Sequence, residues 1–148
     1  MFEELKEIEL SGKKYPIKCD LVVLEKAQEA YGSIEKFEAG LITWEPELDE
    51  NGEPVTEEAD GEEKRKYHGK FPKAKAVIDG LWWMACEGEA ITAEKEGRTP
   101  ATITREGIAR KADLSLITLA NQLHDEFYRC FNSKNGKTTQ IPKEIETP

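Results

Sequence analysis

Few residues in this chain of 148 have the types and spacing that catalysis or metal binding requires. We expect His68 to be exposed and His124 to lie at the edge of a core, and neither has a sequence neighbour that completes a catalytic pair. Three widely spaced cysteines, Cys19, Cys86 and Cys130, are typical of reduced thiols rather than of a disulfide framework or a zinc site. The sequence contains no phosphate-binding glycine loop, serine elbow or helical pair of metal-binding histidines. We therefore expect a protein that is not an enzyme and has no metal or cofactor.

Negative charge is concentrated in one segment. Residues 45–63 hold ten acidic and no basic residues, and removing these ten charges from the net charge of −9 leaves +1 for the rest of the chain. The segment is rich in proline and glycine and poor in residues that fill a core. We therefore expect residues 45–66 to form a long, exposed and mobile acidic loop, with a short hairpin at residues 50–53.

Charge and hydropathy also exclude two kinds of partner. A net charge of −9 and a pI near 4.9 argue against binding to a phosphate backbone. The basic cluster at residues 64–66 directly follows ten carboxylates, which would repel phosphate and neutralise the cluster internally. No run approaches the roughly 18 apolar residues of a membrane span, and the acidic N-terminus does not resemble a secretory signal. We expect a cytoplasmic protein that binds neither nucleic acid nor membranes.

The apolar pattern predicts an α+β, mostly helical fold, with one globular domain at residues 1–131 and a polar C-terminal tail at residues 132–148. Short alternating runs around a Ser11-Gly12 turn predict an N-terminal antiparallel β-hairpin, with Pro16 in an edge strand. About five helices follow. We place them at residues 21–31, from Ser33 onward, at 73–86 with Gly88 as the end, at 104–112 and at 116–131.

The last of these helices is strongly amphipathic. Its apolar face consists of Leu116, Ile117, Ala120, Leu123, Phe127, Cys130 and Phe131. We expect Phe127 to be a core residue. Glu126 and Arg129 fall on the opposite, polar face of the predicted helix.

Two adjacent tryptophans, Trp82 and Trp83, lie in the predicted helix at residues 73–86. Their side chains diverge by about 100° at 3.6 residues per turn. Because the apolar stripe runs through Leu81, Trp82 borders it more closely, and we expect Trp83 to be the more exposed ring. Aromatic side chains are favoured anchors of interfaces, so Trp82 and Trp83 are candidate partner-binding residues, although a larger core explains the pair equally well.

The segment from Lys14 to Ser33, KYPIKCDLVVLEKAQEAYGS, resembles the start of the tail assembly chaperones of long-tailed phages and prophages of Gram-positive bacteria. Those proteins begin with a short β-element, a K-Y-P-I-K-like strand and a helix that ends in Q-x-x-Y-G-S. The tryptophan-containing segment 76–90 and the short helix at 104–112 are also similar to that family. The acidic stretch 45–66 is longer than the family usually carries.

This resemblance implies a non-enzymatic chaperone that acts in the cytoplasm of the host cell. Such chaperones bind the tape-measure protein during tail assembly, keep it soluble and give way as tail-tube subunits polymerise. The tape-measure protein and the tail-tube protein are therefore the expected partners, and a homo-oligomer is compatible with this role. The acidic stretch favours an alternative function as an acidic regulatory adaptor or DNA mimic.

Overall fold

The computed structural model describes residues 4–131, which form an α+β fold; the predicted tail at residues 132–148 lies outside them. The strands are β1 (Lys6–Leu10), β2 (Lys13–Ile17), β3 (Trp44–Pro46), β4 (Thr56–Ala59), β5 (Glu62–Arg65) and β6 (Tyr67–Gly69). The helices are α1 (Leu21–Tyr31), α2 (Ile34–Ala39), α3 (Ala74–Glu96), α4 (Arg105–Lys111) and α5 (Leu116–Phe131). None of these helices is long and apolar enough to cross a bilayer within the described residues.

The elements before the acidic segment form as predicted. β1 and β2 pair antiparallel around Ser11 and Gly12, whose φ angles of 50° and 80° suit a two-residue hairpin turn. The Asp20 carboxylate accepts two backbone N–H bonds from the first turn of α1, and Gly32 ends that helix with a φ of 87°. Ser33 caps α2 in the same way. These local hydrogen bonds confirm the predicted hairpin and the first two helices.

The central helix α3 is longer than predicted. It passes through Gly88 and ends at Glu96, followed by the capping residue Gly97 with a φ of 70°. A Cβ atom at Gly88 would lie 2.0 Å from the carbonyl oxygen of Pro16 in β2. Near this crossing the backbone N–H of Lys18 donates a hydrogen bond to the carbonyl oxygen of Met84 at 3.1 Å. The prediction that Gly88 ends the helix is wrong, because this glycine serves the close approach of a strand.

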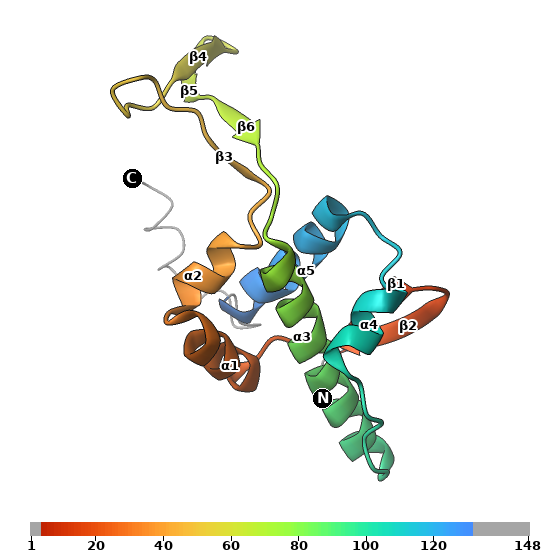
Figure 1. The fold of residues 1–148 in the computed structure, drawn as a ribbon. Coiled ribbons are helices and arrows are strands. Elements are labelled where there is room, and N and C mark those ends of the chain that lie inside the picture. The colour runs from red at the N-terminus through yellow and green to blue at the C-terminus, as the bar shows by residue number, and fades with distance from the viewer. Residues whose placement is uncertain (1–3, 132–148) are drawn as a thin grey trace.

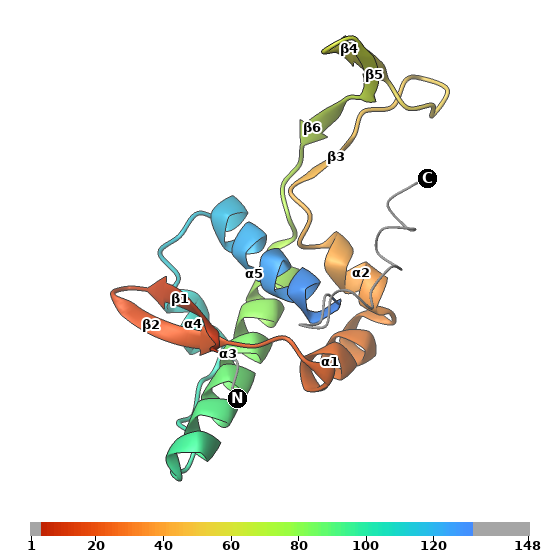
Figure 2. The ribbon, with the colours of Figure 1, turned by 180° about the vertical axis from the view of Figure 1, so that it is seen from behind.

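The aromatic core lies where α3 meets α1, α2 and α5. The ring of Phe37 is central, with centroid distances of 5.4 Å to Tyr31, 5.7 Å to Trp83 and 5.9 Å to Phe127. A Cβ atom at Gly80 would lie 3.1 Å from this ring, so the glycine lets α2 approach α3 closely. Figures 1 and 2 show α1 and α2 on one side of α3, with the β1–β2 hairpin and α4 on the other. The predicted core position of Phe127 is confirmed by its 2% exposure.

The later helices also match their predicted positions. Thr104 caps α4, and its hydroxyl accepts a hydrogen bond from the backbone N–H of Gly107 at 3.0 Å. α5 buries Ala120 and Leu123 of the predicted apolar face, and it also buries Leu119. Ile117 of the predicted face is 40% exposed, so the buried face is turned toward Leu119.

The acidic segment is a β-ribbon rather than a loop. β3 pairs with β6, and β4 pairs with β5 further along. We call residues 44–69 the arm; it projects from the helices in both views (Figures 1 and 2). Every residue of its four strands except the half-buried Ala59 is exposed, which confirms the expected exposure. The prediction of a loop is wrong, because the backbone groups of this segment pair with one another whatever their side chains carry.

Two tight turns shape the outer part of the arm. At the first, the hairpin predicted for residues 50–53 is present: the N–H of Gly52 donates to the carbonyl of Asp49 at 2.9 Å. At the second, Asp60 and Gly61 have φ angles of 54° and 77°, the left-handed conformation that a two-residue hairpin requires. Asp and Gly are the residue types that tolerate this backbone most easily, so the local sequence specifies both turns.

Substitution of Gly88 by alanine should separate β2 from α3. The new methyl group cannot fit beside the Pro16 carbonyl, so we expect a loss of about 1–3 kcal/mol or more, even though alanine favours helices more than glycine does. Urea unfolding followed by circular dichroism measures this loss. A variant as stable as the wild type would show that β2 does not pack here.

Replacement of residues 47–66 by a short glycine-serine turn should leave the body folded. None of these residues is buried, so the free energy of unfolding should change by less than about 1 kcal/mol. For a chain of this size that corresponds to a shift in Tm of a few degrees, about 2–8 °C at most. Loss of a cooperative thermal transition would instead assign the arm a structural role.

Candidate partner-binding site

The two candidate tryptophans have structural partners, and their exposures are the reverse of the prediction. Trp83 is 8% exposed and its ring lies 6.3 Å from that of Tyr31, whereas Trp82 is half-buried. The Trp82 indole Nε1 donates a hydrogen bond to the carbonyl of Ile103 at 2.8 Å. The expectation that Trp83 is the more exposed ring is wrong, because α3 is covered on two sides and not along one stripe. A role of Trp82 and Trp83 in partner binding stays a prediction.

A buried carboxylate on α3, Asp79, joins three elements. Its Oδ2 accepts hydrogen bonds from the Tyr31 hydroxyl at 2.8 Å and the Lys75 ammonium at 2.9 Å, and its Oδ1 accepts from Arg105 Nε at 2.7 Å. Burial alone would raise the pKa of Asp79, but these hydrogen bonds outweigh it and hold the pKa below its ordinary value. A carboxylate with this many donors is fixed as an anion, so it connects α1, α3 and α4 rather than serving as an acid or base.

Glu126 on α5 is a second buried carboxylate, so the prediction that it lies on the exposed polar face of this helix is wrong. Its side chain is 1% exposed, and its Oε2 accepts a hydrogen bond from the backbone N–H of Cys19 at 2.8 Å. Arg129 Nε donates to its Oε1 at 2.8 Å. Glu126 faces inward because the N–H of Cys19, just after β2, needs an acceptor inside the core. The three cysteines are free thiols, and burial raises the pKa of Cys19 above its ordinary value.

Each histidine contacts a carboxylate that its sequence neighbours do not reveal. His68 is exposed in β6, and its Nε2 lies 3.2 Å from an oxygen of Glu45, its cross-strand partner in β3. His124 is partly buried, as predicted, and its Nε2 lies 2.9 Å from an oxygen of Glu38 in α2. Within residues 4–131, no group of three or more histidine, cysteine, aspartate or glutamate side chains is placed to hold a metal ion.

A cavity of about 420 Å³ opens where the arm leaves the body. One wall is the segment that leads into β3, including Leu41 and Trp44, and the other is the face of α5 that carries Asn121 and His124. The Thr43 hydroxyl donates a hydrogen bond to Asn121 Oδ1 at 2.8 Å and so joins the two walls. Both walls are held by partners within the fold, so the cavity is a built feature of the surface.

Two of the residues that line this cavity, Trp44 and His124, each pack against a further aromatic ring. The Trp44 ring packs against Tyr67 with a centroid distance of 4.7 Å, and on α5 the His124 ring stacks on Tyr128 at 6.4 Å. We call Trp44, Tyr67, His124 and Tyr128 the arm-root patch. Exposures of 56% for Trp44, 41% for Tyr67 and 43% for Tyr128 leave these large rings accessible. Aromatic rings bordered by polar groups are typical anchors of protein interfaces, which makes the arm-root patch the strongest candidate for a binding surface.

Sequence reasoning missed the arm-root patch, because Trp44 and Tyr67 lie 23 positions apart in the chain. Only the β3–β6 register, in which Tyr67 opposes Pro46 and Trp44 opposes Gly69, brings them together. The available signal was weak: an aromatic residue stands on each flank of the acidic segment.

Glu87 on α3 should make the stability depend on pH. Burial, together with a hydrogen bond and charge repulsion from Asp20, raises its pKa from 4.5 to about 7. Between these values the folded state holds a proton that the unfolded chain has lost. The free energy of unfolding should therefore fall as pH rises from about 4.5 to 7, and this contribution should change little above pH 7.

The Glu87→Gln variant cannot lose this proton and should show a flatter profile. Urea unfolding at pH 5, 6, 7 and 8 measures the difference. Parallel profiles of the variant and the wild type would contradict the raised pKa.

Comparison with known proteins identifies no relative. No protein-family model matches the chain, and neither a curated protein nor a solved structure matches it. The fold and the arm-root patch therefore carry the functional argument together with the sequence resemblance described above.

Proposed function

We propose that this protein is a non-enzymatic tail assembly chaperone that binds the tape-measure protein during the morphogenesis of a phage tail. The observation that carries the proposal is the arm-root patch, where Trp44 and His124 line a cavity of about 420 Å³ and Tyr67 and Tyr128 pack against these two rings. The resemblance of residues 14–33 to such chaperones supplies the identity of the client and of the tail-tube protein as a second partner.

A chaperone that keeps an apolar client soluble needs two surfaces with opposite properties. One must accept apolar side chains, because the hydrophobic effect drives most protein association. The arm-root patch meets this need, since a helical client could insert a ridge of apolar side chains between the arm and α5. The other surface must keep the complex in solution.

The arm supplies that second property. It carries the ten carboxylates of residues 45–63 on an extended ribbon (Figure 1), and the first of them, Glu45, directly follows Trp44 of the arm-root patch. High net charge suppresses non-specific association, and added Asp and Glu improve solubility more than added Lys and Arg. An acidic arm next to an apolar binding surface is therefore well suited to holding an aggregation-prone client.

The arm also supports the alternative function of an acidic regulatory adaptor or DNA mimic. Its carboxylates are exposed on paired strands, an arrangement that could occupy a basic groove of a nucleic-acid-binding protein. This alternative predicts binding through the carboxylates, with little dependence on the aromatic rings.

Co-expression with the tape-measure protein of the same phage tests the proposal. The Trp44→Ala and Tyr128→Ala variants should each weaken co-purification of the client at least tenfold, because interface aromatic anchors contribute about 2 kcal/mol or more. Leu21→Ala is the matched control, since Leu21 is 80% exposed on α1, away from the arm-root patch.

Two outcomes would contradict the chaperone proposal. The first is a wild-type protein that does not capture the tape-measure protein. The second is capture that is lost when Glu57 and Glu58 are changed to glutamine but persists in Trp44→Ala, which would favour the acidic adaptor. Thermal melts of each variant establish that the fold is intact.

A further inference from the structure

A second cavity lies away from the arm, beside the C-terminal half of α3. It has a volume of about 450 Å³ and is bordered by β2, the C-terminal half of α3, the connection after that helix, and α4. Four cationic residues line it, Lys13, Lys14, Arg98 and Lys111, whereas Glu89 is the one acidic residue among the described lining residues. A cavity of this size can accept several side chains of a partner.

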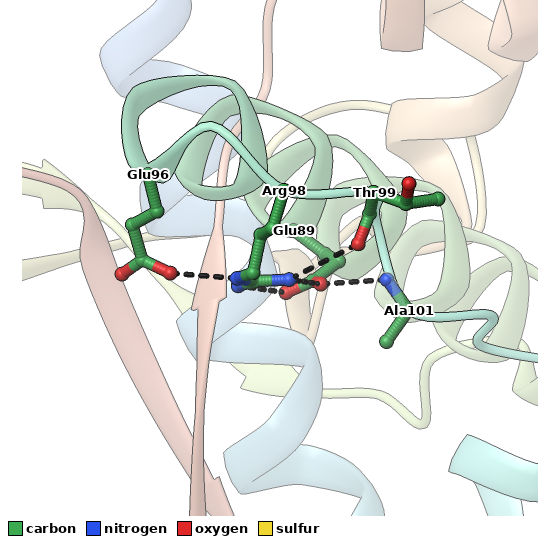
Figure 3. Close-up of polar contacts among 5 residues, drawn as sticks. All are labelled: Glu89, Glu96, Arg98, Thr99 and Ala101. Carbon is green, nitrogen blue, oxygen red and sulfur yellow. Dashed lines mark hydrogen bonds and ion pairs between the residues drawn. The ribbon is translucent and has the colours of Figure 1, made fainter.

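The negative charge of Glu89 is already compensated by a neighbouring cation. Figure 3 shows Glu89 beside Arg98 and the backbone of Ala101; its Oε2 accepts from Arg98 Nη1 at 2.6 Å and from the Ala101 N–H at 2.7 Å. These hydrogen bonds hold the pKa of Glu89 below its ordinary value. Arg98 also donates to Glu96 at 2.6 Å. The pairing shapes the rim of the cavity and leaves the lysines to determine its charge.

The lysines of the cavity form no salt bridge with a carboxylate of the described residues, although the charge of Lys13 acts on Glu89 from a longer distance. The Lys13 ammonium lies 5.0 Å from the centre of the Tyr15 ring and forms no ion pair within residues 4–131. The ammonium groups of Lys14 and Lys111 likewise pair with no carboxylate in the described part of the chain. Lys13, Lys14 and Lys111 outnumber Glu89, which already binds Arg98, so the lining favours an anionic occupant.

The outer hairpin of the arm, β4–β5, carries an excess of negative charge. In the β4–β5 register, Glu58 stands directly opposite Glu63, and Glu62 opposes Ala59 next to Asp60 at the turn. Like charges directly opposite one another destabilise a strand pair, so this tip lacks a cationic partner within its own hairpin. Closer to the body the register is complementary, with Glu57 opposite Lys64. Within the β4–β5 hairpin, the excess negative charge therefore lies at the tip.

The tip cannot reach the cavity of its own chain. The arm joins α3 at the N-terminal end of that helix, whereas the cavity contacts its C-terminal half, at Glu89 and Thr92. The arm also extends away from that half in both views (Figures 1 and 2). Any contact between the two charged surfaces must join separate molecules.

We propose that the β4–β5 tip of one copy docks into the lysine-lined cavity between β2 and α4 of a second copy. Charge complementarity supports this occupant, because carboxylates crowd the tip while lysines line the cavity beside the C-terminal half of α3. The contact is head-to-tail: each copy offers a tip and a cavity, and the chain of copies grows until it closes into a ring or is capped. This inference does not rest on the chaperone function.

Sedimentation velocity of three proteins tests the proposal. They are the wild type, a tip variant (Glu58→Gln, Glu62→Gln, Glu63→Gln) and a cavity variant (Lys14→Gln, Lys111→Gln). At low ionic strength the average mass of the wild type should rise with concentration and fall again when salt shortens the Debye length to a few ångströms, about 3 Å at 1 M. Each variant alone should associate at least tenfold more weakly. A Lys6→Gln, Lys36→Gln protein is the matched control, since both lysines are exposed outside the cavity, and it should behave as the wild type.

Mixing the two variants distinguishes a head-to-tail contact from any other. The intact tip of the cavity variant should dock into the intact cavity of the tip variant, and the pair should stop at a one-to-one complex. A mixture that stays monomeric, or that grows as the wild type does, would overturn the proposal. A wild-type chain that stays monomeric at high concentration and low salt would also overturn it, and would leave the cavity to an acidic segment of another protein.

Discussion

The burial of Phe37 against α3 is the packing interaction on which the rest of the structure depends. Its ring is fully buried and contacts aromatic rings from α1, α3 and α5, so one side chain joins four helices. The close approach requires Gly80 beneath the ring. It also fixes the arm, because the carbonyl of Gly40, which caps α2, accepts a hydrogen bond from the N–H of Lys73 at 2.8 Å just before α3 begins. The direction of the arm is therefore set by how α2 packs on α3.

Buried carboxylates connect the parts that apolar packing leaves apart. Asp79 joins α4 to α3 through Arg105, and Glu126 joins α5 to the residue that follows β2. Removing one partner of such a pair leaves a charge without compensation, so these contacts select one arrangement of the helices more than they add stability. They also explain why two acidic side chains occur inside a protein whose other described carboxylates lie nearer the surface.

The sequence predicted the features that depend on local chemistry. Asp20, Ser33 and Thr104 each cap a helix as expected, because a cap is formed within a few residues. The predictions that were wrong concern residues that depend on long-range contacts. Gly88, Trp83 and Glu126 each respond to an element far away in the chain, and no local pattern reports that element.

The arm and the arm-root patch also depend on contacts that the sequence alone does not show. Composition correctly indicated exposure, but strand pairing in a polar segment follows from turn geometry and backbone hydrogen bonds, which a count of acidic residues does not contain. The arm-root patch needs, in addition, the packing of α5 against the segment leading into β3. Its four rings come from three elements, so the sequence shows each aromatic residue but not that the four rings lie close together.

The position of the arm between α2 and α3 has a consequence for synthesis on the ribosome. Phe37 emerges early, but its partners Trp83 and Phe127 follow only after the whole arm has been translated. At about 5–20 residues per second, that interval lasts several seconds. Meanwhile the hairpins of the arm can close in microseconds, since their contacts are local. Until the second half arrives, the nascent chain thus carries the acidic arm beside an apolar segment that has no core to enter, and negative charge of this kind disfavours non-specific association.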